Sequence, residues 1–172
     1  MKGSDYVATF LRDKVSNVFG LQGGAVVHIF DSCERIGPRP IYCHHEQAAG
    51  FAACGYARVR GFGACVVTTG PGATNALTPL LGAWQDSLPV MFISGQQRSQ
   101  HLSYGLPVRQ VGTQESRILE IVKPITKAAN LALDAEHIEI ALKHAYMKMV
   151  DGRPGPVWVD IPLDAQYGTH SY

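Results

Sequence analysis

The chain has 172 residues, of which 46% are hydrophobic and 17% are charged, and its formal net charge at pH 7 is +1. This length and composition indicate one compact α/β domain and exclude a disordered chain. The near-neutral charge gives no reason to expect a nucleic-acid partner or an acidic membrane surface, and no apolar run is long enough to span a bilayer. Because no apolar signal segment opens the sequence, we expect a cytoplasmic protein.

The cysteines do not follow a metal-binding or disulfide pattern. The four of them form no Cys-x-x-Cys pair and have no histidine nearby at zinc-finger spacing. Cys43 and Cys65 fall in predicted buried strands, and Cys33 and Cys54 fall in predicted helices. We therefore expect no metal site and four reduced thiols that pack as small hydrophobic side chains.

Helices and strands are predicted to alternate along the whole chain. Ser4 is predicted to cap the first helix, in which apolar residues recur at helical spacing as far as Val15. The elements that follow are, in chain order, a strand at 18–21, a helix at 25–36, a strand at 40–43, a helix at 45–60, a strand at 64–68, a helix at 73–85, a strand at 89–94, a helix at 115–121, a strand at 125–131, a helix at 134–150 and a strand at 156–160.

One long stretch, residues 96–114, fits neither kind of element. It is polar, contains glycine and proline, and shows no sustained period, so we predict a long loop of the kind that is usually functional or mobile. Elsewhere the strands are continuous apolar runs. This pattern predicts a doubly wound α/β fold, with a six-stranded parallel sheet and helices on both of its faces.

Glu46 is the first candidate for chemistry. It lies at the start of a predicted helix, directly after the strand at 40–43, and the next strand ends in a Gly/Pro-rich turn at 69–75. Parallel strands bring such ends to one edge of a sheet, where a carboxylate held out of water becomes basic enough to move protons. The alternative is that Glu46 is only a first-turn acidic residue, which the helix dipole favours. The 69–75 turn is not a P-loop, and residues 20–24 lack the spacing of a dinucleotide fingerprint.

A series of short motifs follows in a fixed order along nearly the whole chain. They are Val18-Phe19-Gly20, Gly23-Gly24, His45-Glu46-Gln47, Gly55-Tyr56-Ala57-Arg58, Gly70-Pro71-Gly72-Ala73-Thr74-Asn75, Asp86-Ser87, Gly95-Gln96, Gln114-Glu115, Pro124-Ile125-Thr126-Lys127 and Gly152-Arg153-Pro154-Gly155-Pro156 through Asp160-Ile161-Pro162. This order resembles the pyrimidine-binding, N-terminal domain of thiamine-diphosphate-dependent enzymes, a superfamily that includes acetohydroxyacid synthase, pyruvate oxidase and benzoylformate decarboxylase. The sequences of Gly70–Asn75 and Lys123–Lys127 are most similar to the acetohydroxyacid (acetolactate) synthase branch.

The resemblance implies a role for each site residue. Glu46 would hydrogen-bond N1′ of the aminopyrimidine and drive the imino tautomer that takes the proton from C2 of the thiazolium. Gln114 matches a glutamine that faces the substrate, so both residues are expected to be catalytic. The other expected cofactor contacts are Gly23, Gly24, Pro71, Gly72 and Asn75.

Three positions depart from the family pattern. Gln22 stands where the family usually has a proline before Gly-Gly, and His44 duplicates the histidine that precedes the glutamate. Thr113 replaces a phenylalanine before the Gln-Glu pair, so the resemblance says least about the substrate pocket.

The family binds the diphosphate and Mg²⁺ through a second domain that carries Gly-Asp-Gly, and some members bind FAD in a central domain. These 172 residues contain no Gly-Asp-Gly. We therefore expect residues 1–172 to form a single pyrimidine-binding domain, with Mg²⁺ and any FAD bound by domains outside it. The expected partners are a diphosphate-binding domain of the same or another chain and a second copy in a homodimer, and the chain alone is expected to be inactive.

Three functions remain open. The leading hypothesis is acetolactate synthase-like chemistry, in which pyruvate, a small 2-oxoacid, is decarboxylated and its two-carbon unit is transferred to an acceptor. The second is half of a 2-oxoacid decarboxylase that forms no carbon–carbon bond. The third is a non-catalytic interaction module of the same fold, against which the intact Glu46 argues.

Overall fold

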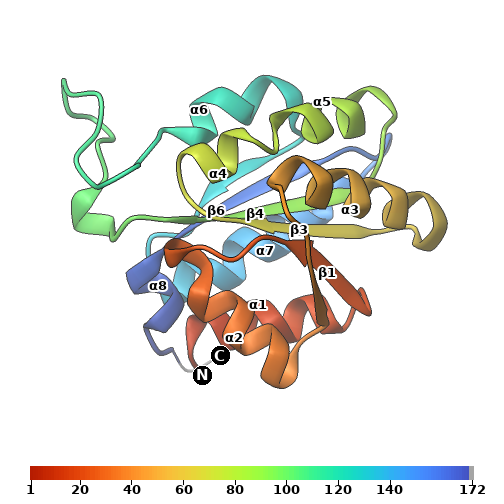
Figure 1. The fold of residues 1–172 in the computed structure, drawn as a ribbon, viewed down its shortest axis with the longest axis horizontal. Helices are drawn as coiled ribbons and strands as arrows, with labels where there is room; N and C mark the ends of the chain where they lie inside the picture. The colour runs from red at the N-terminus through yellow and green to blue at the C-terminus, as the bar shows by residue number, and fades with distance from the viewer. Residues whose placement is uncertain (171–172) are drawn as a thin grey trace.

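The computed structural model describes residues 1–170, and at its centre is a six-stranded sheet with the strand order β2-β1-β3-β4-β6-β5 (Figure 1). Every neighbouring pair of strands is parallel. The predicted fold, a doubly wound parallel sheet, is confirmed. The strands are β1 (Asn17–Gly20), β2 (Arg39–Tyr42), β3 (Gly63–Val67), β4 (Val90–Gln96), β5 (Ala129–Leu131) and β6 (Val157–Pro162).

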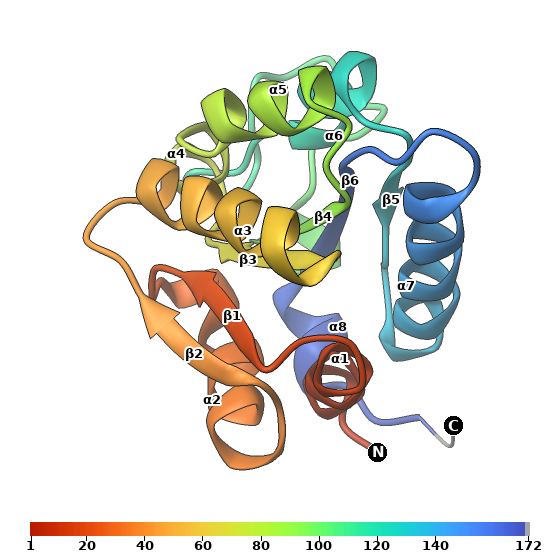
Figure 2. The ribbon, with the colours of Figure 1, turned by 90° about the vertical axis from the view of Figure 1, so that its right-hand side faces the viewer.

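Helices form a layer on each face of the sheet (Figures 1 and 2). The lower layer in Figure 1 contains α1 (Gly3–Arg12), α2 (Val27–Ile36), α7 (Ala135–Val150) and α8 (Leu163–Tyr167). The upper layer contains α3 (Glu46–Arg60), α4 (Pro71–Thr74), α5 (Leu77–Gln85) and α6 (Ile118–Val122). Single 3₁₀ turns, η1 (Gly24–Val26), η2 (Ser99–His101) and η3 (Lys123–Ile125), connect some of these elements.

The central strands separate two hydrophobic cores, one under each helix layer. Side chains alternate along a strand, so Val157 and Val159 of β6 join the core beneath α1, α2 and α7, whereas Trp158 joins the core beneath α3, α5 and α6. Trp158 is fully buried and stacks on Phe92, with the ring centroids 5.4 Å apart. This burial on both faces explains why the central strands read as continuous apolar runs.

Two of the predicted helix starts are wrong. The first helix begins at Gly3 with Lys2 at its cap, and Ser4 is buried inside it, where its hydroxyl accepts a hydrogen bond from Ser32 (2.9 Å). The predicted helix at 115–121 begins only at Ile118, because the side chain of Glu115 accepts hydrogen bonds from the preceding loop.

Other elements also differ from the prediction. The helix at 73–85 is two helices, α4 and α5, separated after Thr74. The strand at 125–131 is reduced to β5, since η3 ends only at Ile125 and the hydroxyl of Thr126 donates back to the carbonyl oxygen of Val122 (3.1 Å). Cys43 lies after the end of β2 and is only half-buried, although all four cysteines are free as predicted. The helix α8 was not predicted.

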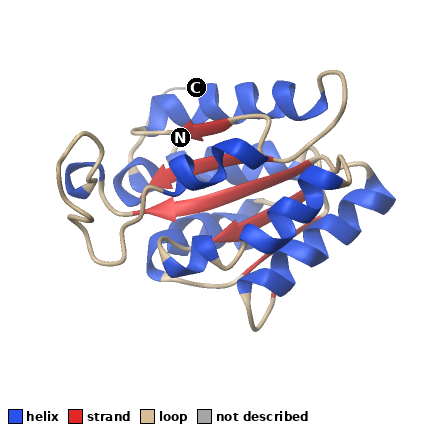
Figure 3. Ribbon diagram, turned by 90° about the horizontal axis from the view of Figure 1, so that it is seen from above, coloured by secondary structure: helices blue, strands red, loops and turns tan. Residues whose placement is uncertain are grey.

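Because every neighbouring pair is parallel, the strands share one direction, and the arrowheads visible in Figure 3 point to the side of the molecule from which the long loop extends. That loop, residues 97–117, contains only the short η2 and is otherwise irregular, as the sequence predicts. Within the described residues, no helix has both the length and the apolar character that crossing a membrane requires.

Candidate functional site

The ends of β1 and β3 lie side by side, at the point where the order of strands across the sheet reverses. In open α/β sheets, ligands bind outside the carboxyl ends of the strands at such a point. The two loops that follow these strands touch, because the N–H of Ala25 donates to Oγ1 of Thr68 (3.3 Å). A side chain at Gly23 would place its Cβ 2.5 Å from the Cβ of Thr68, whereas a Cβ at Gly24 would meet no described atom within 4 Å. Gly23 therefore permits the close approach, and Gly24 borders open space.

Glu46 opens α3 at this same edge. The ring of His45 caps the helix, its Nδ1 accepting from the N–H of Gln47 (3.1 Å). The Glu46 side chain is buried, and its Oε2 accepts from Nδ2 of Asn75 (3.0 Å). Asn75 reaches Glu46 from the break between α4 and α5, so this interruption of the helix positions the amide group. One carboxylate oxygen is thus fixed by a neutral donor.

The second oxygen of Glu46 faces the Gly70–Asn75 turn. A Cβ on Gly72 would lie 3.3 Å from Oε1 of Glu46 and 2.6 Å from Cγ2 of Thr68, so glycine leaves the space beside this oxygen free of a side chain. No hydrogen-bond donor among residues 1–170 reaches Oε1. Pro71, the first residue of α4, is exposed on the same turn. Oε1 is therefore available to share a proton with the ring nitrogen of a ligand.

Gln114 is brought to the other side of this turn by the long loop. Gly70 has φ +57°, and a Cβ there would lie 1.9 Å from the carbonyl oxygen of Gln114. Gln114 also has a positive φ, 60°, and it is exposed. The two backbones thus meet at a position that only glycine tolerates, which sets Gln114 beside the turn that contains Pro71 and Gly72.

Glu115 and Arg117 hold the long loop closed. The carboxylate of Glu115 accepts from the N–H groups of Ser103 and Val111 (both 2.9 Å), and Arg117 donates to the carbonyl oxygens of Ser103 (3.0 Å) and Leu106 (2.7 Å). Burial pushes the pKa of Glu115 upward, but the hydrogen bonds from Ser103 and Val111 outweigh it, so the net pKa lies below the ordinary value. The loop is long, but it is tied together by charge-assisted hydrogen bonds.

A buried polar cluster beneath the site was missed in the sequence. Asp160 of β6 is fully buried and accepts from Oγ of Ser94 (2.5 Å) and from Nε2 of Gln96 (3.0 Å), both on β4. Burial raises the pKa of Asp160 to about 7, although the two hydrogen bonds oppose this shift. Gln96 and Asp160 occur in the family-like motifs, but no pattern in the sequence shows that they are paired.

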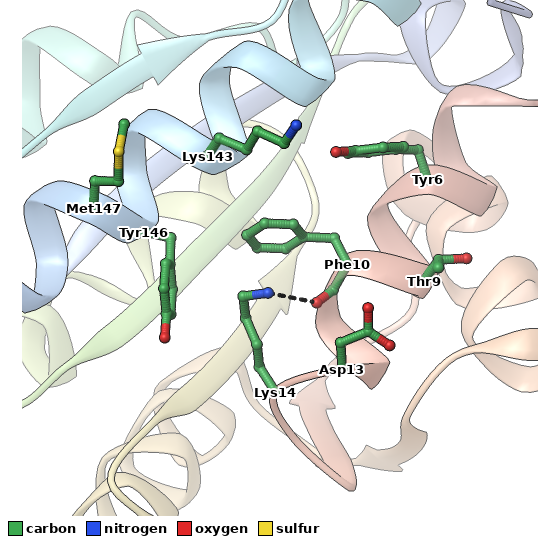
Figure 4. A pocket seen from close by; sticks show the side chains of 8 residues that line it. All are labelled: Tyr6, Thr9, Phe10, Asp13, Lys14, Lys143, Tyr146 and Met147. Carbon is green, nitrogen blue, oxygen red and sulfur yellow. Dashed lines mark hydrogen bonds between the residues drawn. The ribbon is translucent and has the colours of Figure 1, made fainter. Parts of the chain in front are cut away.

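A separate hollow of about 470 Å³ lies between α1 and α7 (Figure 4), two helices that cover the face of the sheet opposite α3. Nζ of Lys14 lies over the rings of Phe10 (3.9 Å) and Tyr146 (4.9 Å) there, so the ammonium group stabilises the helix pair through cation–π contacts. The residues that line this hollow are Tyr6, Thr9, Phe10, Asp13, Lys14, Lys143, Tyr146 and Met147.

No group of three or more His, Cys, Asp or Glu side chains able to hold a metal ion is present among the described residues.

Comparison with known proteins agrees with this geometry. Residues 1–121 match the family described as "Thiamine pyrophosphate enzyme, N-terminal TPP binding domain". The chain belongs to this family of thiamine pyrophosphate enzymes. Thiamine pyrophosphate and thiamine diphosphate are two names for the same cofactor. The match extends from the first helix through Glu46 and the Gly70–Asn75 turn to α6.

The chain is also similar to several acetolactate synthases. It is 44% identical over 167 residues to the acetolactate synthase large subunit of Haemophilus influenzae, and 41% identical over 171 residues to acetolactate synthase 2, chloroplastic, of Nicotiana tabacum. It is 39% identical over 171 residues to the acetolactate synthase isozyme 2 large subunit of Escherichia coli. These alignments cover 95%, 96% and 96% of this chain but only 28%, 24% and 30% of the respective relatives. The chain therefore spans between about a quarter and a third of the length of these relatives.

The site residues fit the aminopyrimidine end of thiamine diphosphate. The fit rests on two observations. Oε1 of the buried Glu46 is a hydrogen-bond acceptor without a partner, and Gly72 has no side chain to fill the space in front of it. Gly24 borders the same edge without a neighbouring atom in its Cβ direction.

Proposed function

We propose that this chain forms the pyrimidine-binding half of a thiamine diphosphate site, in an enzyme that decarboxylates pyruvate and transfers the two-carbon unit to a carbonyl acceptor. The observation that carries the proposal is the carboxylate of Glu46, with Oε2 fixed by Asn75 and Oε1 open beside Gly72. The similarity to acetolactate synthases supports the reaction class.

Glu46 would hold a proton at N1′ of the aminopyrimidine. Its burial disfavours water as a competing partner, and the amide of Asn75 fixes the plane of the carboxylate without neutralising its charge. Pro71, Gly72 and the Gly23-Gly24 pair would line the ring, while Gln114 would face the substrate. When bound, the cofactor itself supplies the electron sink for decarboxylation.

The other half of the site would come from a diphosphate-binding domain, of the same chain or of another, that holds Mg²⁺ through carboxylate and phosphate oxygens. FAD, where it is used, would bind in a further domain. Residues 1–172 would then be inactive when alone. We further propose a cytoplasmic location, which the four free cysteines support.

Product analysis tests the proposed reaction. The complete protein, given pyruvate, thiamine diphosphate and Mg²⁺, is expected to release CO₂ and accumulate acetolactate, with no turnover when thiamine diphosphate is omitted. Acetaldehyde as the sole organic product would replace the proposal with the decarboxylase alternative. Absence of both products, with the partner domain present and folded, would favour the non-catalytic module.

We also propose that two copies of the chain pair through α3 and α5. Phe51 of α3 and Trp84 of α5 are 49% and 41% exposed, which is unusual for aromatic side chains on neighbouring helices of a monomer. The Phe51→Glu substitution is expected to weaken self-association at least about 10-fold, because it places a charge in the centre of the contact. Sedimentation over a range of concentrations would measure the effect, with Ile140→Glu as the matched control. Ile140 is 59% exposed on α7, in the opposite helix layer. Equal effects of the two substitutions would contradict this interface.

A further inference from the structure

Gln96 connects three segments of the site edge through one side chain. Its amide is fully buried at the end of β4 and makes all four hydrogen bonds that such a group can form. Oε1 accepts from Oγ1 of Thr69 (2.6 Å) and from the N–H of Gln97 (3.0 Å). Nε2 donates to the carbonyl oxygen of Ser116 (2.9 Å) and to Oδ2 of Asp160 (3.0 Å).

The partners of Gln96 leave its amide a single orientation. The carbonyl oxygen of Ser116 accepts and cannot donate, so it must face the amide nitrogen, while the N–H of Gln97 must face the amide oxygen. Asp160 is itself held by Ser94, whose hydroxyl also accepts from the indole of Trp158 (2.7 Å). The anchor of Gln96 is therefore part of the central sheet.

The segments that Gln96 joins are those that meet at Gly70. Thr69 directly precedes Gly70, and Ser116 lies two residues after Gln114. Because a Cβ at Gly70 would lie 1.9 Å from the carbonyl oxygen of Gln114, the two backbones are already in close contact. A small shift of either segment would thus change how the turn and the loop fit together.

We propose that Gln96 is a positioning residue, which sets the Gly70–Asn75 turn and the Gln114 segment at a fixed separation by bonding Thr69, Ser116 and Asp160 at once. The expected effect on cofactor binding rests on the proposed function, because the turn contains Gly72 and Asn75, which border Glu46. Gln96 touches neither cofactor nor substrate in this role. It acts through the two segments that would.

Direct replacement of Gln96 would leave Asp160 and the carbonyl of Ser116 without partners, so such a variant risks failing to fold. Thr69→Val is the sharper change. It keeps the shape of the side chain, removes only the hydroxyl that links Gln96 to the turn, and leaves Oε1 of Gln96 with the N–H of Gln97. Thr69→Ser retains the hydroxyl and serves as the rescue variant.

Thr126→Val is the matched control. Thr126 is also buried, 8% exposed, and its hydroxyl donates to the carbonyl oxygen of Val122 (3.1 Å) at the end of α6, outside the proposed network. Both substitutions remove one buried hydroxyl, so both are expected to lower the melting temperature. Only a positioning role predicts that cofactor affinity falls in Thr69→Val and stays unchanged in Thr126→Val.

The experiment uses the complete enzyme and two measurements. Calorimetric titration with thiamine diphosphate and Mg²⁺ is expected to give about 3- to 10-fold weaker binding for Thr69→Val, the range set by the loss of one hydrogen bond, and unchanged binding for Thr69→Ser and Thr126→Val. Hydrogen–deuterium exchange without cofactor is expected to quicken in residues 70–75 and 112–117 for Thr69→Val alone.

Exchange in those two segments that is unchanged in Thr69→Val, or equally faster in Thr126→Val, would overturn the positioning role. Unchanged cofactor affinity in Thr69→Val would also overturn it. A wild-type enzyme that binds no thiamine diphosphate would instead refute the proposed function, and the exchange comparison would still decide whether Gln96 couples the two segments.

Discussion

The Asp160→Asn variant is expected to gain about 4 kcal/mol in free energy of unfolding, relative to the wild type, as the pH rises from about 4 to about 8. Burial raises the pKa of the fully buried Asp160 to about 7, against 3.8 for the unfolded chain, although hydrogen bonds from Ser94 and Gln96 oppose the shift and the charge of Glu115 adds to it. Between these two pKa values the folded protein keeps a proton that the unfolded chain has released. Wild-type stability due to this group therefore falls with rising pH, while asparagine carries no such proton.

Denaturant unfolding of the wild type and of Asp160→Asn at several pH values between about 4 and about 8 measures this difference. The difference between the two proteins, rather than either curve, is the relevant quantity, because groups such as His28, whose pKa is lowered by burial, contribute equally to both. The expected difference curve has a slope that approaches about 1.4 kcal/mol per pH unit in the middle of the range. Two parallel curves would show that folding does not shift the pKa of Asp160 and would contradict this account of the buried cluster.

The central strands could be predicted because their sequences have only one suitable environment. Every residue of β3, β4 and β6 is buried, and apart from Ser94, Gln96 and Asp160 their side chains are apolar, which suits a sheet covered on both faces. The strand β5 is different. It has three residues at the sheet edge and follows a proline-containing 3₁₀ turn, and the sequence pattern does not show where the turn ends and the strand begins.

The predicted helix boundaries are wrong where a side chain has a partner that is distant in the sequence. Serine is a common helix-capping residue, but Ser4 is buried against Ser32 of α2. The helix at 73–85 is interrupted where Asn75 turns toward Glu46. Local propensity describes what a segment prefers alone, and these contacts are made by tertiary packing.

The candidate site was partly predictable for the same reason. Glu46 and the Gly70–Asn75 turn follow strands, and the parallel sheet brings their ends together, which the sequence alone predicts. The cluster of Ser94, Gln96 and Asp160 depends on the register of β4 against β6, in which Ser94 is opposite Asp160. No local pattern indicates that register, so these residues could be found only in the folded chain.

In the complete enzyme, Glu46→Gln is expected to slow cofactor activation by about 10²- to 10⁴-fold, the usual contribution of a positioned acid–base group. Glutamine has the size of glutamate, and its oxygen still accepts from Asn75, so the fold is expected to persist. It carries no negative charge, and its amide cannot stabilise a proton at N1′. Glu120→Gln is the matched control, because it removes the same charge from an exposed side chain of α6.

The most direct test of this account is the exchange rate of the C2 proton of thiamine diphosphate bound to the complete enzyme, followed by NMR after transfer to deuterated buffer and acid quench. Wild type and Glu120→Gln are expected to exchange at the same rate, and Glu46→Gln is expected to exchange at least about 100-fold more slowly, at a similar melting temperature and with thiamine diphosphate still bound. Equal exchange rates in folded, cofactor-bound wild type and Glu46→Gln would contradict the central claim that Glu46 activates the cofactor.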